Sequence, residues 1–134
     1  MEKITLLLVD DEPKVLLLLA DVLKKESWHV LTATQGEEAL ALLSKEKVDI
    51  VVSDIYMPVM NGLRMRDTIR QDPKLKDIPI LFISGYNDQM TMAAIRFPKI
   101  EGFLQKTKPP RDLIKWIRFL TTPLDKRIGL SPNM

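Results

Sequence analysis

The chain has 134 residues, of which 46% are hydrophobic and 28% are charged, and its formal net charge is +2. A chain of this length can bury roughly two-thirds of the surface that it exposes when unfolded, so we expect one compact domain. The absence of cysteine excludes disulfides, thiolate zinc sites and cysteine nucleophiles. The single histidine, His29, excludes a multi-histidine metal cluster.

The charge is unevenly distributed along the chain. Residues 1–67 hold eight Lys or Arg and twelve Asp or Glu, whereas residues 99–134 hold eight and three. A nucleic-acid interface would need clustered Lys or Arg combined with aromatic stacking partners, or a known reader motif, and the basic part shows neither pattern, so we expect no direct nucleic-acid partner. No apolar run approaches the ~20 residues that span a bilayer, and no signal-peptide pattern is present. We therefore expect a soluble cytoplasmic protein that does not bind membranes.

Short apolar runs alternate with segments of helical periodicity along most of the chain. In order, we expect strands at residues 4–9, 28–33, 50–53, 80–83 and 102–105, alternating with helices at residues 13–26, 37–44, about 62–71, 88–97 and 110–121. Pro13 suits the first turn of a helix, whereas Pro73 and Pro98 end helices. Five strands alternating with five helices predict an α/β fold, with a doubly wound parallel sheet covered on both faces.

The domain is expected to span residues 1–121. Residues 122–134 contain Pro123, Gly129 and Pro132, and we expect them to form an unpacked C-terminal tail or the start of a linker.

Polar residues follow the predicted strands at the points where they end. Asp10 and Asp11 follow the first strand, Asp54 the third, Ser84 the fourth and Lys106 the fifth. In open α/β sheets the functional site lies beyond these ends. If the first and third strands are neighbours, three carboxylates converge, and a hard divalent cation such as Mg²⁺ would compensate their charge. An aspartate beside Mg²⁺ can attack phosphorus, while a lysine and a hydroxyl complete a phosphate pocket.

Four segments also carry a family resemblance: residues 8–13 (LVDDEP), 53–62 (SDIYMPVMNG), 83–86 (ISGY) and 102–106 (GFLQK). In order and spacing, from about Lys3 to Leu120, the chain resembles the receiver domain of bacterial two-component response regulators. The resemblance implies a flavodoxin-like sheet with strand order 2-1-3-4-5. It also implies a signalling domain that catalyses only its own phosphorylation and dephosphorylation, and is otherwise not an enzyme.

The resemblance implies a role for each site residue. Asp54 would accept the phosphoryl group, and Asp10 and Asp11 would hold Mg²⁺ together with the Asp54 carboxylate and the Tyr56 backbone carbonyl. Lys106 would neutralise the charge of the phosphoryl group, and Ser84 would donate a hydrogen bond to it. Phe103 would turn inward as the aromatic switch.

The resemblance also implies the partners. The phosphoryl donor would be a histidine kinase or a histidine phosphotransfer domain, and phosphorylation would switch the surface of the fourth helix, fifth strand and fifth helix. A homodimer could form through that surface or through the first helix. Residues 16–19 are four consecutive leucines, and because they cannot all face one side of a helix, some should be exposed for docking or dimer contact.

Two departures from the family pattern affect these expectations. Thr107 stands where the family usually has proline, often behind a cis peptide bond, so the loop should differ or contain a costly non-proline cis bond. Lys108-Pro109 offers a competing alignment, but it spoils the spacing to the switch position, so we favour Lys106. Gly85 replaces the common alanine and affects the stiffness of the switch loop.

Several alternatives stay open. His29 is expected to be an ordinary strand histidine rather than a phosphodonor, and Phe103 could equally be simple edge packing. Tyr56 and Tyr86 are expected to flank the phosphorylation site and to slow hydrolysis of the aspartyl phosphate.

The competing functions are a receiver-shaped interaction module that is never phosphorylated and an aspartyl-phosphate phosphohydrolase. The phosphohydrolase would need a second acid where Tyr56 stands. A flavin-binding protein would need a glycine-rich loop after the first strand, where this chain has Asp10, Asp11 and Glu12.

Overall fold

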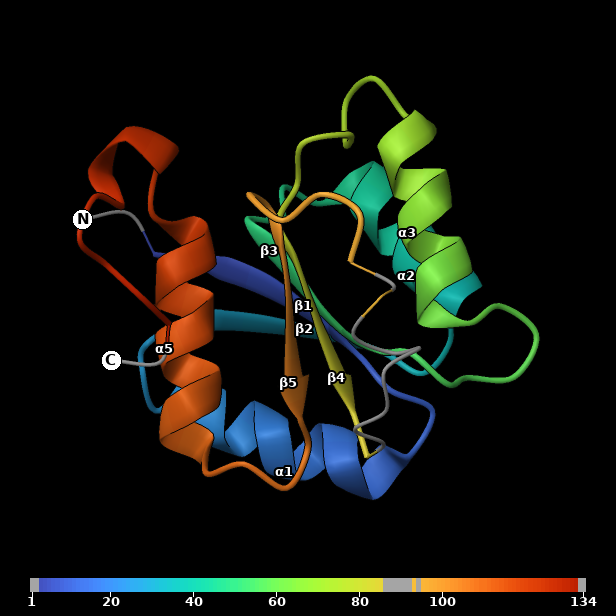
Figure 1. Cartoon of the computed structure of the whole chain (residues 1–134). Coiled ribbons are helices and arrows are strands. Elements are labelled where there is room, and N and C mark those ends of the chain that lie inside the picture. Colours follow the sequence, from blue (N-terminus) through green and yellow to red (C-terminus); the bar gives the residue numbers. More distant parts are fainter. Residues whose placement is uncertain (1–2, 86–92, 94, 133–134) are drawn as a thin grey trace.

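The computed structural model describes residues 3–85, 93 and 95–132. Five parallel strands form one sheet in the order β2-β1-β3-β4-β5, which confirms the predicted topology (Figure 1). The strands are β1 (Thr5–Val9), β2 (His29–Ala33), β3 (Ile50–Asp54), β4 (Ile80–Ser84) and β5 (Glu101–Gln105). The helices are α1 (Pro13–Lys24), α2 (Gly36–Lys45), α3 (Gly62–Gln71) and α5 (Pro110–Thr121), followed by the short 3₁₀ helix η1 (Leu124–Lys126).

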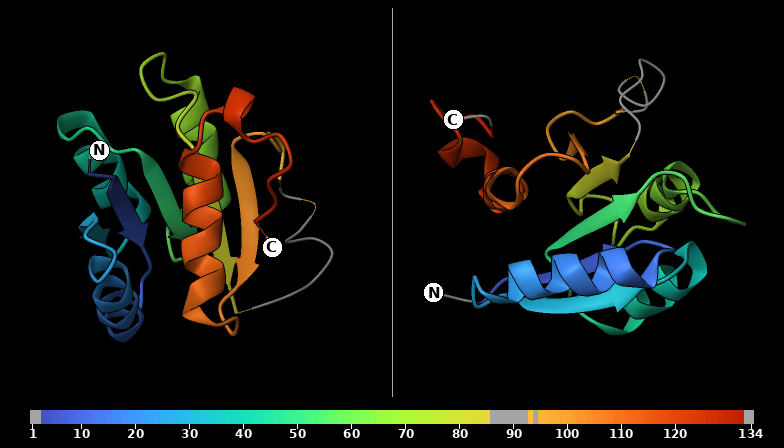
Figure 2. Two further views of the ribbon diagram at one scale, coloured as in Figure 1. Left: turned by 90° about the vertical axis from the view of Figure 1, so that its left-hand side faces the viewer. Right: turned by 90° about the horizontal axis from the view of Figure 1, so that it is seen from below.

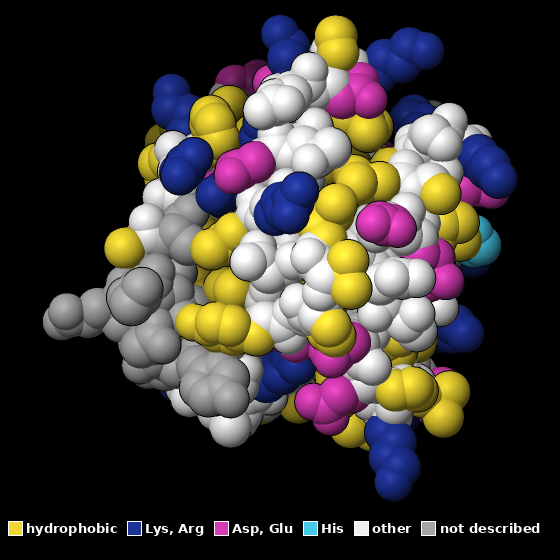
Figure 3. Space-filling model, turned by 90° about the vertical axis from the view of Figure 1, so that its right-hand side faces the viewer, with side chains coloured by type: hydrophobic (Ala, Val, Ile, Leu, Met, Phe, Trp, Pro, Cys, Tyr) yellow, Lys and Arg dark blue, Asp and Glu magenta, His cyan; other side chains and the backbone are white. Residues whose placement is uncertain are grey.

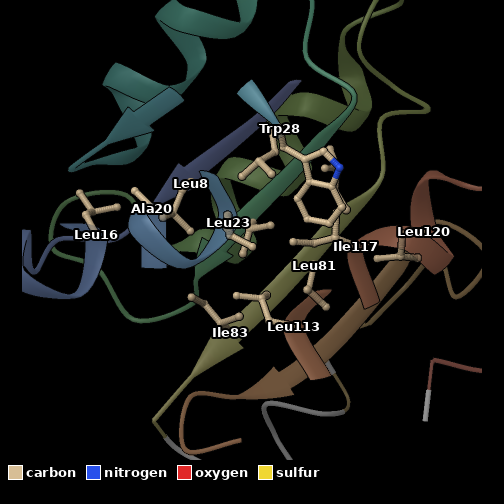
Figure 4. Packing of buried hydrophobic residues seen from close by; sticks show 13 residues of the cluster. Leu8, Leu16, Ala20, Leu23, Trp28, Leu81, Ile83, Leu113, Ile117 and Leu120 are labelled. Atoms are coloured by element: carbon tan, nitrogen blue, oxygen red, sulfur yellow. The ribbon is translucent and has the colours of Figure 1, made fainter. Parts of the chain in front are cut away.

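Apolar side chains cover both faces of the sheet, because its central strands are apolar along most of their length. One core cluster joins the sheet to α1 and α5 and includes Leu8, Leu23 and Ile117 (Figure 4). A second cluster on the other face joins the sheet to α2 and α3 and includes Phe82 and Met65. The helices therefore hold the strand ends rigidly in place.

Helix α1 begins at Pro13 and presents two sides of its leucine run to different environments. Leu16 is buried, whereas Leu17 and Leu18 are 69% and 67% exposed. This confirms the expectation that part of the run points outward. None of the helices in the described part of the chain is long and apolar enough to cross a membrane.

The prediction of five helices is corrected, because the described residues form four α-helices. Within the expected helix at 88–97, residues 93 and 95–97 are not helical, and the remainder lies outside the described residues. The carboxylate of Glu101 accepts hydrogen bonds from the backbone N–H groups of Arg96 and Phe97. Phe97 also precedes Pro98, which disfavours helical backbone. Both effects disfavour a helix in this stretch before β5.

The segment after α5 packs against the domain more closely than the expected loose tail. Arg127 donates hydrogen bonds to the carbonyls of Leu120, Thr122 and Lys99, and its guanidinium lies over the ring of Phe119. The turned views show η1 at the end of α5, with the chain then turning back alongside that helix (Figure 2). A cation at a helix C-terminus satisfies otherwise unpaired carbonyls, which explains the attachment.

On β5, Gly102 allows the indole of Trp116 to lie directly against the strand. A Cβ atom built at Gly102 would lie 2.2 Å from the Trp116 ring. Any larger residue at position 102 would therefore push the Trp116 ring, which extends from α5, away from the strand.

Candidate functional site

The strands bring the sequence-predicted site residues to one edge of the sheet. Val9 pairs with Ser53 between β1 and β3, so Asp10 and Asp54 end neighbouring strands. Ser84 pairs with Gln105 between β4 and β5, and the N–H of Lys106 donates to the Ser84 carbonyl at 2.8 Å. The carboxyl ends of β1, β3, β4 and β5 thus carry one continuous polar site.

Three carboxylates form the acidic part of this site. Oxygen atoms of Asp10, Asp11 and Asp54 all lie within 4.8 Å of one another. Asp10 and Asp54 are buried, and Asp11 is more open to solvent. At the lower end of the face shown in Figure 3, acidic side chains gather next to a basic one. This is the end at which the strands of Figure 1 finish.

Lys106 is the cation of the site. Its Nζ lies 2.7 Å from Oδ2 of Asp10 and 3.1 Å from Oδ2 of Asp54. The contact with Asp54 is a hydrogen bond. Asp10 Oδ2 lies close to Nζ but has no hydrogen bond of acceptable geometry within the described part of the chain. Lys106 therefore neutralises the site incompletely, because three carboxylates face one ammonium.

Backbone groups fix the directions of the two buried carboxylates. Asp10 Oδ1 accepts the N–H of Glu12 at 2.9 Å, and Asp54 Oδ1 accepts the N–H of Tyr56 at 3.3 Å. The other oxygen of each carboxylate faces Lys106. Gly62, at the start of α3, packs on the backbone of Asp54, where a Cβ atom would lie 2.2 Å from the Asp54 carbonyl oxygen.

The electrostatic environment shifts the pKa of two groups. Burial raises the pKa of the Asp54 carboxyl, and the hydrogen bond and positive charge of Lys106 only partly oppose this. For the Lys106 amine, burial alone would lower the pKa, but Asp10 and Asp54 outweigh it and raise the pKa above its ordinary value. Ionised Asp54 is thus held at some free-energy cost, whereas Lys106 stays charged.

The residues present fit a hard cation. Oxygen atoms from three carboxylates within 4.8 Å of one another are the kind of donor set that Mg²⁺ prefers. Asp10, Asp11 and Asp54 could hold such an ion.

The structure also places the remaining predicted residues. Ser84 is fully buried at the end of β4, and Phe103 is half-buried on β5, opposite Phe82. It is Lys106, rather than the exposed Lys108, that contacts Asp10 and Asp54.

The loop that carries Thr107 avoids the costly bond, because the described residues include no cis peptide bond. His29 begins β2 and is exposed at the opposite end of the sheet from the carboxylates. Tyr56 is 47% exposed beside the site, whereas Tyr86 lies outside the described residues.

Sequence reasoning missed a second charged cluster. The carboxylate of Glu101 at the start of β5 is buried between Arg66 and Arg70 of α3. The sequence carried one signal for this cluster: Arg66 and Arg70 are four residues apart, on the same side of the helix as the apolar Ile69.

Comparison with known proteins shows the family. Residues 6–118 match the response regulator receiver domain. A 14.6 kDa uncharacterised protein from Leptolyngbya boryana is 32% identical over 114 residues, which cover 84% of this chain and 86% of that protein. The heme response regulator HssR of Staphylococcus aureus is 37% identical over 99 residues, which cover 63% of this chain and 43% of HssR. The matched part thus spans less than half of the length of HssR.

Solved structures agree with this match. The chemotaxis protein CheY4 of Vibrio cholerae has a TM-score of 0.82 and 28% identity, with 89% of this chain and 99% of that chain covered. The response regulator TrrA of Thermotoga maritima, solved in complex with Mg²⁺ and BeF, has a TM-score of 0.74 and 30% identity, with 87% and 98% covered. The chain belongs to the response regulator receiver domain family and is a signalling domain of two-component systems.

Proposed function

We propose that this chain is a phosphoacceptor that receives a phosphoryl group on Asp54 from a phosphohistidine of a partner protein. The observation that carries the proposal is the contact of the Lys106 amine with two buried carboxylates, Asp10 and Asp54, with Asp11 beside them. In the reaction an Asp54 oxygen forms a bond to phosphorus while the bond from phosphorus to the histidine nitrogen breaks. The electron pair stays on that nitrogen, and Asp54 becomes an acyl phosphate.

Mg²⁺ would be held by Asp10, Asp11 and Asp54, together with the Tyr56 carbonyl. When bound, it supplies positive charge that neutralises the phosphoryl oxygens. The structure of TrrA in complex with Mg²⁺ and BeF supports this assignment by similarity. Lys106 would leave its contact with Asp54 to bind the incoming phosphoryl group.

The Ser84 hydroxyl would hydrogen-bond the phosphoryl group, and Phe103 would change its packing in response. This change would alter the surface formed by residues 95–97, β5 and α5, which could also support a homodimer. Water would later hydrolyse the acyl phosphate and regenerate Asp54, at a rate slowed by Tyr56 and Tyr86. Residues 1–121 would form the working domain, and residues 122–134 its tail.

A histidine kinase or a histidine phosphotransfer domain would dock next to the site. An apolar groove of about 340 Å³ runs between α1 and the start of α5, lined by Leu18, Val22, Leu104, Lys106 and other residues. Leu18 of this lining is 67% exposed. The groove includes the site lysine itself, so a helical partner seated there would bring its phosphohistidine close to Asp54. We place this reaction in the cytoplasm.

Incubation with Mg²⁺ and acetyl phosphate, followed by intact-mass measurement, tests the proposal. We expect a mass increase of roughly 80 Da, one phosphate, in the wild type and in the exposed-residue control Asp21→Asn. The variant Asp54→Asn should show none. An absent adduct in the wild type, or an adduct that survives Asp54→Asn, would refute the assignment and favour an interaction module.

A further inference from the structure

The start of β5 carries a buried carboxylate that the proposed phosphoryl chemistry does not use. Glu101 is 3% exposed and lies at the opposite end of the sheet from Asp54. Its Oε2 accepts two hydrogen bonds from Arg70, from Nε at 3.1 Å and from Nη2 at 2.9 Å. Its Oε1 accepts one from Nη1 of Arg66 at 3.0 Å. Arg70 on one oxygen and Arg66 on the other hold this carboxylate in one orientation.

The two arginines connect Glu101 to α3 and to the sheet. Arg66 is 1% exposed, and its guanidinium lies over the ring of Phe82, with 5.6 Å to the centroid. Arg70 also donates to the carbonyls of Lys76 and Ile78. Because α3 begins at Gly62, against the backbone of Asp54, one rigid helix spans the distance from the carboxylate site to Glu101.

Glu101 also holds the backbone that leads into its own strand. Its Oε1 accepts the N–H of Arg96 at 3.1 Å and that of Phe97 at 3.3 Å. The neighbouring Ile95 belongs to the same apolar cluster as Phe103, the predicted switch residue. Phe103 points to the same face of β5 as Glu101, two residues away, since side chains alternate along a strand. Ile95 and Phe103 therefore pack against the same apolar cluster, which links residues 95–97 to the predicted switch residue.

We propose that Glu101 is a positioning residue that latches residues 95–97 and α3 in the unphosphorylated arrangement, and that releasing this latch favours the phosphorylated state. The inference rests on the proposed function. Buried ion pairs add little net stability compared with apolar packing but can select one arrangement of a fold, which is what a two-state switch needs. By linkage, a contact that stabilises the resting arrangement must weaken the binding of any ligand that prefers the other arrangement.

The test compares Glu101→Gln with the matched control Glu37→Gln, which makes the same chemical change at an exposed position of α2. Glu101→Gln keeps the shape of the side chain but removes its negative charge. It also places an amide NH₂ group, a hydrogen-bond donor, opposite an arginine. The first readout is amide hydrogen exchange of Arg96 and Phe97 in metal-free protein. The second is the dissociation constant for beryllium fluoride in the presence of Mg²⁺, measured by calorimetry.

For Glu101→Gln we expect exchange of both amides to accelerate about tenfold. We also expect beryllium fluoride to bind about fivefold or more tightly than in the wild type. Glu37→Gln should change neither. If Glu101→Gln does not fold, Arg70→Lys, which retains the charge but loses the paired hydrogen bonds to Oε2, should shift both readouts in the same direction by less.

Unchanged exchange, or binding that is equal or weaker in a folded variant, would overturn the latch and leave Glu101 a merely structural residue. Failure of the wild type to bind beryllium fluoride would instead refute the proposed function. The exchange measurement would then decide alone whether Glu101 holds residues 95–97.

Discussion

The two ends of the sheet each carry a buried cluster of charges, but the clusters are built in opposite ways. At the carboxyl end, the described residues place Asp10, Asp11 and Asp54 around a single ammonium group, that of Lys106. At the start of β5, Glu101 accepts five hydrogen bonds, from two arginine side chains and two backbone amides.

The carboxylates at the first cluster are therefore suited to bind a cation, whereas the Glu101 carboxylate already has its full set of hydrogen-bond donors from the protein. Three neighbouring carboxylates that face one ammonium repel one another, so the carboxyl end gains free energy when a cation binds there. The hydrogen-bonding capacity of the Glu101 carboxylate is already used within the protein. Removing Glu101 would leave the buried guanidinium groups of Arg66 and Arg70 without this counter-charge. Chemistry is therefore expected at the first cluster, and positional control at the second.

The largest effect is expected from Glu101→Ala. Breaking a buried ion pair by removing one partner leaves uncompensated charge, so the free energy of unfolding should fall by about 3–5 kcal/mol. Chemical denaturation would measure it, with Glu37→Ala as the exposed control. If Glu101→Ala lowers the free energy of unfolding no more than Glu37→Ala does, the Glu101 cluster does not stabilise the fold.

Lys106→Ala should have the next largest effect, on chemistry rather than on folding. Without the amine that neutralises the developing charge, the rate of phosphorylation by acetyl phosphate should fall about 10²–10³-fold. Lys108→Ala, two residues away and exposed, should stay close to the wild-type rate. Equal phosphorylation rates in both variants would show that Lys106 does not assist phosphoryl transfer.

Addition of Mg²⁺ should stabilise only the acidic end. At a concentration one hundred times its dissociation constant, the ion should raise the free energy of unfolding by about 2.7 kcal/mol, because it binds the folded chain alone. Thermal denaturation with and without Mg²⁺ measures this. The increment should vanish in Asp10→Asn but persist in Glu37→Gln, and its survival in Asp10→Asn would place the ion elsewhere.

The smallest effect is expected from Asp11→Asn in metal-free protein. Removing one of three neighbouring negative charges relieves repulsion, so the free energy of unfolding should rise by about 1 kcal/mol. The exposed control Asp21→Asn lies outside this cluster and should show no such gain. A decrease in Asp11→Asn would show that Lys106 already compensates all three carboxylates.

The sequence allowed the fold and the acidic cluster to be predicted because both depend on local signals. Apolar runs locate the strands, and residues such as Asp10 and Asp54, which stand directly after or at the end of a run, must meet when those strands are neighbours. The Glu101 cluster depends instead on partners 31 and 35 residues away. In sequence, Glu101 resembles a solvated residue at the start of a strand, so neither its burial nor its hold on residues 95–97 was predictable.

The close contact of Trp116 with Gly102 provides an optical probe of the strand on which both Glu101 and Phe103 lie. The only other tryptophan, Trp28, belongs to the core beside α1. In a Trp28→Phe background, the emission of Trp116 would come from a ring that packs on β5 at Gly102, on the opposite face of the strand from Glu101 and Phe103. Stopped-flow fluorescence could then follow rearrangement of the strand in real time, without an attached label.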